Sequence, residues 1–349
     1  MQADTRRFLI LAEEKFSPLR SKTANAAIVY LRENVLGVID STKAGKTAQD
    51  ILGYGGSIPV VSSMEEGLRL DPTHLLIGIA PPGGRLPESW KKDIMRALSA
   101  GVHILSGLHT ILSDDPEIMG ARRNGAEITD YRKIPPESEV VPRGTWTSRK
   151  SRVLLTVGTD CNIGKMTTML QLMKEFRARD LRADFVATGQ TGMLVRGRGI
   201  AVDSIIGDYM AGCIEKEIDQ SVAEGYEYIF VEGQGALTHQ AYSGVTLGLI
   251  HGTMPDAYLL CHQPTRLKDD FGITLPSLEY AIRLHEMVMS HFKPAKVIGI
   301  ALNSIGLNDD ESMEWAARIE SETGLPAVDT FRFGGKKLTD AIVQFFETR

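Results

Sequence analysis

The stretch GTDCNIGK, Gly158 to Lys165, decides the fold of the second half of this chain. It follows the apolar run VLLTV at 153–157 and precedes TTMLQLMKEFRARD at 167–180, where apolar residues recur at helical spacing. A strand, a glycine-bounded loop, Gly-Lys and a helix in this order are the pattern of a phosphate-binding P-loop. We therefore predict that loop N–H groups and the start of the helix face one anion, with Lys165 as a point charge on it.

The residue after Gly-Lys departs from the usual pattern. A Ser or Thr normally stands there and holds Mg²⁺ through its hydroxyl, whereas this chain has Met166. A thioether is a poor ligand for a hard cation. We therefore expect the loop to hold phosphate rather than Mg-ATP, and we predict no metal ligands. The predicted cofactor-binding residues are Gly158, Thr159, Asp160, Cys161, Asn162, Ile163, Gly164, Lys165, Met166 and Thr167.

Length and composition limit the class of protein. A chain of 349 residues favours two domains, and a net charge of -5 gives no basic face for nucleic acid. No apolar run approaches the ~20 residues of a membrane helix, and the N-terminus lacks the features of a signal peptide. Three widely spaced cysteines, with no Cys/His cluster at zinc spacing, are typical of reduced thiols. We expect a cytoplasmic protein without nucleic-acid or membrane partners, and a homo-oligomer.

The whole chain alternates short apolar runs with helical patterns, which predicts two α/β domains with parallel sheets. We expect a Rossmann-like domain at 1–140, a Pro- and charge-rich linker at 141–150, and a P-loop NTPase-like domain at 151–349. Further strands of the P-loop domain are predicted at 183–188, 226–233, 256–263 and 296–304. Such sheets bind ligands at the carboxyl ends of their strands, and the candidate residues below follow these ends.

Glu232 is the first candidate catalytic residue, because it follows the apolar run YIFV and precedes Gly233. An acid on a strand beside a P-loop can accept a proton, orient water or bind a metal. His239 is the second candidate, within the Gly-rich segment 233–255, which we predict to be an irregular binding loop. His251, in the same segment, is an alternative base.

Substrate-binding residues are predicted at the same strand ends. Gln190 lies in TGQTG at 188–192, and the N–H groups of Gly233, Gln234 and Gly235 can stabilise an oxyanion. Arg266 follows the fourth strand of the domain and can pair with a carboxylate.

The N-terminal domain offers one further candidate. Asp40 follows the apolar run VLGVI and is placed like the acid that binds a ribose hydroxyl in dinucleotide folds. No G-x-G-x-x-G precedes it. The sequence leaves two interpretations of this domain: it binds a ligand, or it is vestigial or serves oligomerisation.

These motifs together resemble a known family. The segments GTDCNIGKMTT, VEGQGAL, YSGVTLGLIHG and HQPTR are similar to those of a two-domain bacterial and archaeal family. That family was long catalogued as a domain of unknown function and is associated with D-glutamate N-acetyltransferase. The resemblance covers nearly the whole chain and implies a Rossmann-like domain followed by a P-loop domain. A more distant similarity to dethiobiotin synthetase rests on GTD, the Gly-Lys loop and the later Glu-Gly.

The resemblance implies transfer of an acetyl group from acetyl-CoA to the amine of a small acidic substrate, D-glutamate. The P-loop would hold phosphates of the cofactor, and Glu232 or His239 would take a proton from the amine. A second reading is an ATP-dependent ligase or kinase that acts on a small carboxylic acid, with ATP and Mg as cofactor and Thr167 or Glu232 as the magnesium ligand. A third reading is a non-enzymatic nucleotide-sensing regulator.

Overall fold

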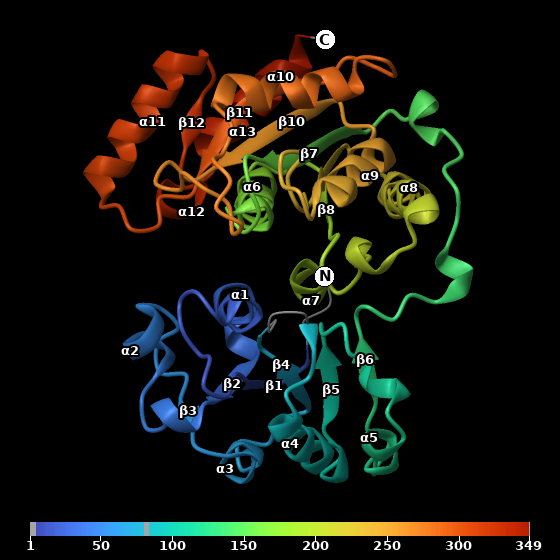
Figure 1. Cartoon of the computed structure of the whole chain (residues 1–349), viewed down its shortest axis with the longest axis vertical. Helices are drawn as coiled ribbons and strands as arrows, with labels where there is room; N and C mark the ends of the chain where they lie inside the picture. Colours follow the sequence, from blue (N-terminus) through green and yellow to red (C-terminus); the bar gives the residue numbers. More distant parts are fainter. Residues whose placement is uncertain (1–4, 80–83, 349) are drawn as a thin grey trace. The chain divides into compact units, whose positions relative to one another are not determined.

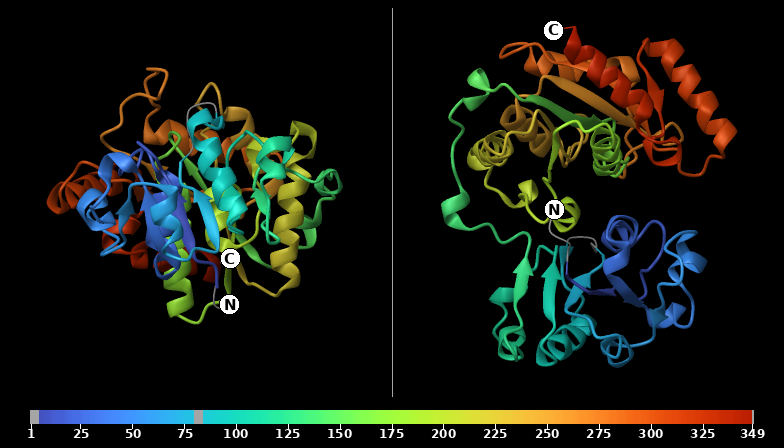
Figure 2. Two further views of the ribbon diagram at one scale, coloured as in Figure 1. Left: turned by 90° about the horizontal axis from the view of Figure 1, so that it is seen from below. Right: turned by 180° about the vertical axis from the view of Figure 1, so that it is seen from behind.

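The computed structural model describes residues 5–79 and 84–348, and these form two compact units. The first contains residues up to Ile134 together with Met193–Arg198, and the second contains Pro135–Gly192 and the chain from Gly199 onward. Each unit has its own parallel sheet with helices packed against it (Figure 1). Figure 2 shows the two sheets from two further directions.

The first unit is a Rossmann-like domain. Its six strands pair in the order β3-β2-β1-β4-β5-β6, and every pairing is parallel. This is the strand order of dinucleotide-binding domains, with the switch point between β1 and β4. The strands are β1 Phe8–Leu11, β2 Val35–Ile39, β3 Val60–Val61, β4 His74–Ile77, β5 His103–Ser106 and β6 Ile128–Asp130. The helices are α1 Lys22–Tyr30, α2 Ala48–Leu52, α3 Met64–Leu68, α4 Glu88–Ser99 and α5 Pro116–Gly120.

Asp40 follows β2 as predicted, and its carboxylate is bonded within its own domain. It is fully buried, accepts the main-chain N–H of Phe16 at 3.0 Å and pairs with Lys43 Nζ at 2.7 Å. It also accepts the hydroxyl and N–H of Thr42 at 2.5 and 3.1 Å. A ribose hydroxyl would have to displace one of these donors, so a nucleotide role for Asp40 stays a prediction.

The second unit carries the P-loop on its sheet. The strand order is β12-β11-β10-β7-β9-β8, again parallel throughout. Helices α6 and α13 pack on each other, and α8 packs on α9 (Figure 1). The strands are β7 Arg152–Gly158, β8 Ala183–Val186, β9 Tyr228–Val231, β10 Ala257–His262, β11 Lys296–Leu302 and β12 Ala327–Val328. The helices are α6 Lys165–Ala178, α8 Gly207–Ala223, α9 Ser243–Thr253, α10 Leu278–Met289, α11 Asp309–Thr323, α12 Thr330–Phe333 and α13 Lys336–Glu347. Helix α7, Gln190–Arg196, begins in this unit, and its residues from Met193 belong to the first unit.

The position of β7 determines which residues meet at the site. It pairs with β9 on one side and β10 on the other, with Cys261 beside Gly158 and Val231 beside Leu155. The P-loop after β7, Glu232 after β9 and His262 at the end of β10 therefore share one edge of the sheet. These strands are apolar along their length because helices cover both faces.

The prediction of an irregular loop across 233–255 was wrong for its second half, which forms α9. Gly244, Gly248 and Gly252 recur every fourth residue, so they lie along one face of this helix. A Cβ at Gly248 would lie 2.5 Å from Met210 Sδ, and one at Gly252 would lie 2.7 Å from the carbonyl oxygen of Ala211. These two glycines therefore allow α9 to pack closely on α8, and they do not mark turns.

The predicted linker residues contact the second unit. Arg143 and Thr145 donate their main-chain N–H groups to the carboxylate of Glu215 in α8, at 2.5 and 2.9 Å. The compact units divide between Ile134 and Pro135, whereas the domain boundaries at 140 and 151 stay predictions.

His285 in α10 gives a pH-dependent term in stability. Its Nδ1 donates to the carbonyl oxygen of Ala281 at 2.7 Å, and burial lowers the pKa of His285 to about 4. The unfolded chain, with a pKa near 6.5, binds the proton more tightly. The stabilisation is therefore complete above pH 6.5 and is lost as the pH falls toward 4, at a cost of about 3 kcal/mol. In His285→Leu, the loss of unfolding free energy between pH 7 and 4.5 should shrink by about 2 kcal/mol. Urea unfolding at both pH values checks this, with the exposed His291→Leu as a control that keeps the full loss.

Candidate functional site

The predicted P-loop has the backbone of an anion cradle. It leaves β7 at Gly158, and both Asn162 and Gly164 adopt positive φ, 54° and 101°. Gly164 is the N-cap of α6 and supplies no side-chain acceptor to the first N–H groups of the helix. The positive end of α6 is therefore not neutralised by a side-chain cap, and a ligand oxygen can bind there.

Lys165 is buried at the centre of this loop, only 6 % exposed. Its ammonium donates to the carbonyl oxygen of Asp160 at 2.8 Å, which holds the charge inside the curl of the loop. The lysine stem passes over Gly233, where a Cβ would lie 2.9 Å from Lys165 Cδ and 1.8 Å from the carbonyl oxygen of Thr156. Only glycine fits at 233, which accounts for the Glu-Gly that follows β9.

The side chains after Lys165 differ in burial and in the groups that they bring to the first turn of α6. Met166 is buried in the first turn of α6. Thr168 is also buried, and its hydroxyl contacts Cys261 Sγ at 3.6 Å. Thr167 is half-buried and brings a hydroxyl to this turn. On the other side of the loop, Thr159 Oγ1 lies 3.0 Å from Nδ1 of His262.

Arg266 is paired within the chain. Its Nε lies 2.6 Å from Asp160 Oδ2, and another nitrogen lies 2.7 Å from Asp270 Oδ1. It also donates to the carbonyl oxygen of Cys161 at 3.4 Å. Arg266 therefore braces the P-loop, and its predicted role as a carboxylate ligand for substrate stays a prediction that would require exchange of these partners.

Glu232 ends β9 and is 3 % exposed. Its Oε2 accepts the main-chain N–H of Thr188 at 3.1 Å, and the Thr188 hydroxyl donates to the Glu232 carbonyl oxygen at 2.7 Å. A Cβ at Gly192 in α7 would lie 2.3 Å from the same Oε2. The β8–α7 connection therefore fixes the carboxylate, and the sequence alone did not reveal the part played by Thr188 and Gly192.

The predicted substrate-binding residues near Glu232 differ in how far their hydrogen-bonding groups are already bonded within the protein. The N–H of Gly233 already donates to Thr156 Oγ1 at 2.9 Å, so it is not open to an oxyanion in this state. Gln234 places its side-chain amide 3.3 Å from Thr188 Oγ1, and its carbonyl oxygen accepts from Thr246 at 2.8 Å. Gly235 has a φ of 65° and turns the chain away from the strand. Gln190 is half-buried at the start of α7.

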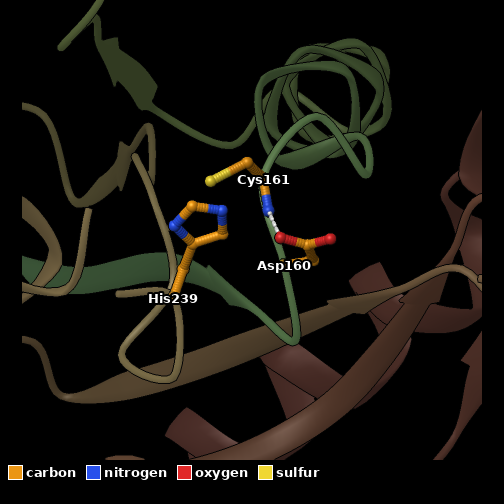
Figure 3. Close-up of side chains that lie close together, drawn as sticks. All are labelled: Asp160, Cys161 and His239. Carbon is orange, nitrogen blue, oxygen red and sulfur yellow. Dashed lines mark hydrogen bonds between the residues drawn. The ribbon is translucent and has the colours of Figure 1, made fainter. Parts of the chain in front are cut away.

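His239 reaches the P-loop, whereas His251 does not. One ring nitrogen of His239, Cys161 Sγ and an Asp160 carboxylate oxygen all lie within 4.8 Å of one another (Figure 3). His251 lies in the last turn of α9, which leads into the amino end of β10, and it packs on Phe292. A parallel sheet binds ligands at the opposite, carboxyl edge, so His239 is the better-placed histidine.

Asp160, Cys161 and His239 carry ligand types that zinc accepts, although no zinc spacing was visible in the sequence. Their surroundings oppose a cation, because Arg266 pairs with Asp160 and Lys165 donates to the same residue. Burial raises the pKa of the Cys161 thiol, which keeps it protonated near neutral pH. This group is better suited to an oxygen-bearing ligand.

Family models match both parts of the chain. Residues 41–134 match a Rossmann-like domain and residues 140–339 match a P-loop domain, the two halves of a domain of unknown function, DUF1611. The chain belongs to this family. A crystal structure of a DUF1611 protein from Anabaena variabilis is 37% identical and superposes with a TM-score of 0.93 over 97% of this chain and 99% of that one. The predicted family and fold class are confirmed.

Two relatives with assigned activities match most of this DUF1611 chain. A protein from Tritonibacter scottomollicae named D-glutamate N-acetyltransferase is 38% identical over 83% of this chain and 87% of its own length. A protein of the same name from a Pseudoalteromonas species is 35% identical over 78% of this chain and 82% of its own. These relatives support an N-acetyltransferase role and confirm the prediction of an enzyme of this class.

Among residues 5–79 and 84–348, no helix is both long enough and apolar enough to cross a membrane.

Proposed function

We propose that this DUF1611 protein transfers the acetyl group of acetyl-CoA to the amine of D-glutamate or a closely similar acidic amino acid. The observation that carries the proposal is the name shared by two relatives that are 35% to 38% identical over about four fifths of the chain. The site described above supports the proposal with a phosphate-binding loop and a buried carboxylate beside it.

The P-loop residues fit the phosphates of coenzyme A. The uncapped start of α6 and the ammonium of Lys165 favour a phosphate group. Met166 offers no hydroxyl for magnesium, which favours a phosphate ligand that binds without the metal. The thioester supplies an activated acetyl group, and the protein has to deprotonate the acceptor amine and stabilise charge on the acetyl oxygen.

Glu232 is the proposed base. Its carboxylate is buried beside the P-loop strand and held by Thr188, so it can take a proton from the acceptor ammonium. The free amine then attacks the thioester carbon, the new C–N bond replaces the C–S bond, and the thiolate of coenzyme A leaves and takes up a proton.

The test of the proposed function uses the purified full chain with acetyl-CoA and a panel of D- and L-amino acids. Release of free thiol and the mass of the N-acetyl product report turnover. We expect the highest kcat/KM with D-glutamate, and thermal stabilisation by coenzyme A without Mg²⁺. Absence of any acetylated acidic amino acid, or ADP formation from Mg-ATP with a carboxylic acid, would overturn the proposal in favour of a ligase or kinase.

A Met166→Thr substitution should supply the hydroxyl ligand for Mg²⁺ that P-loops usually carry at this position. The hydroxyl would stand at the first turn of α6, where P-loops hold Mg²⁺, so Mg-ATP should bind about tenfold more tightly than to the unmodified protein. Calorimetric titration with ATP, with and without Mg²⁺, measures the change. Thr167→Val, which removes the neighbouring hydroxyl, is the matched control. A Met166→Thr protein whose ATP affinity does not respond to Mg²⁺ would contradict our account of this position.

A further inference from the structure

His239 presents one buried ring nitrogen that the mechanism above does not use. The imidazole is 2 % exposed, stacks on Tyr242 with ring centroids 4.7 Å apart and lies 5.3 Å from the ring of Phe271. Tyr242 and Phe271 are themselves exposed, at 47 and 61 %. Two aromatic rings at the surface therefore cover a histidine that faces inward to the P-loop (Figure 3).

The protonation of this ring follows from one hydrogen bond. The main-chain N–H of Ala241 donates to His239 Nδ1 at 3.3 Å. A peptide nitrogen donates and does not accept, so Nδ1 must carry its lone pair toward Ala241. In the neutral ring the proton then sits on Nε2. Within the described part of the chain, this Nε2 is buried and has no hydrogen-bond partner.

The acids near His239 are already paired with Arg266 and leave its Nε2–H to another acceptor. Asp160 is the nearest acid, but its carboxylate accepts the Cys161 N–H at 2.6 Å and pairs with Arg266. The thiol of Cys161 is protonated because burial raises its pKa. Lys165 adds a second positive charge at the loop, and Asp270 beside Phe271 pairs with Arg266. A proton added at Nδ1 would also meet the Ala241 N–H.

We propose that His239 is a hydrogen-bond donor, through Nε2–H, to an oxygen of the bound acetyl donor, and that it is not the base. The oxygen is either a phosphate oxygen in the cradle or the thioester carbonyl oxygen, which becomes negative as the amine attacks. A buried N–H without a partner, next to an anion-binding loop, matches such an acceptor. This inference rests on the proposed function for the identity of the ligand. It assigns proton removal to Glu232 alone.

The first experiment determines the tautomer without any acetyl donor. Long-range ¹⁵N–¹H correlation spectra of the ligand-free full chain at pH 7 distinguish the protonated ring nitrogen from the bare one. The His239→Gln spectrum identifies the signal. In the neutral ring we expect the proton on Nε2, and a proton on Nδ1 would overturn the proposal. Because the spectra do not depend on turnover, they still determine the tautomer if the enzyme acts on another substrate.

The second experiment compares two amides at position 239. The Gln side chain places its NH₂ where Nε2 lies, whereas the shorter Asn places it near Nδ1 and cannot reach the ligand. We expect His239→Gln to keep activity within about tenfold and His239→Asn to lose about 100-fold in kcat/KM. Among the residues that the structure describes, Nε2 has no hydrogen-bond partner, and both variants lose the same ring contacts, so they should melt close to each other. Equal, unchanged activity in both variants would overturn the proposal.

Two further measurements distinguish the two possible acceptor oxygens and test whether His239 is instead the base. If the acceptor is a phosphate, His239→Asn weakens binding of coenzyme A itself. If it is the thioester oxygen, affinity for coenzyme A is kept and kcat falls. Because Glu232 is the proposed base, the acidic limb of the pH profile of kcat/KM should persist in His239→Gln, in which residue 239 cannot titrate. Loss of that limb would make His239 the base and end the proposal.

Discussion

Replacing Lys165 with methionine should weaken the binding of coenzyme A about 100-fold. A charge-assisted hydrogen bond contributes about 1.5–3 kcal/mol net, and about 2.7 kcal/mol corresponds to two decades in Kd. Methionine retains the apolar stem that passes over Gly233, so packing changes little while the ammonium is lost. Calorimetric titration with coenzyme A and with acetyl-CoA measures the effect, and turnover should fall in parallel at subsaturating donor.

Lys174 provides the matched control for this experiment. It lies on the same helix, α6, and is exposed, so Lys174→Met removes the same charge away from the loop. We expect its affinity for coenzyme A to stay within twofold of the unmodified protein. If Lys165→Met bound coenzyme A as tightly as Lys174→Met and still transferred acetyl groups, the phosphates would have to bind elsewhere.

The sequence predicted the framework of this site because local patterns determine it. The apolar run before Gly158 is a central strand with both faces covered, and such strands appear as continuous apolar stretches. The Gly-Lys step predicted a helix directly after the loop, and α6 begins at Lys165, two residues before the predicted stretch at 167–180. In contrast, Phe8–Leu11 forms the central strand β1, yet its short apolar run lies between charged residues near the N-terminus, and no strand was predicted there.

The sequence was less informative where function depends on contacts between distant segments. Cys161 and His239 are far apart in the chain, and no periodicity indicates that their side chains meet. The sequence also did not indicate that Arg266 pairs with Asp160, since an arginine after a strand is equally suited to a substrate carboxylate or to an acid of the chain. Charge complementarity restricts the candidates, and only the strand order β10-β7-β9 determines which partners are within reach.

Gly244, Gly248 and Gly252 illustrate a different ambiguity. Glycine lowers helix propensity, so a segment that contains three of them favours a loop on local grounds. In α9, Gly248 and Gly252 allow the close approach of α8, whose Met210 and Ala211 lie against them. Tertiary packing overrides local helix propensity here. In the sequence, only the recurrence of glycine at every fourth residue indicates that these glycines share one face of a helix.

Replacing Glu232 with glutamine should reduce kcat by 10²- to 10⁴-fold, the usual contribution of a general base. The amide oxygen of glutamine can still accept the Thr188 N–H, so the fold and the acetyl-CoA affinity should be nearly unchanged. Rapid-quench measurement of N-acetyl product at saturating substrates gives kcat, and titration with coenzyme A gives the affinity. A variant that kept more than a tenth of the activity would show that another group accepts the proton.

A second substitution tests the position of the carboxylate while leaving its charge in place. In Gly192→Ala the new Cβ would lie 2.3 Å from Glu232 Oε2, so the carboxylate must move. A displacement of about 1 Å at a reacting group can cost about 100-fold in rate, and we expect a loss of that order in kcat. The matched control is Gly244→Ala, where no atom of the described residues outside the helix's own backbone lies within 4 Å of the added Cβ, and its kcat should be unchanged. If Gly192→Ala were fully active while Glu232→Gln was not, Glu232 would act from a different position than the one Thr188 gives it here.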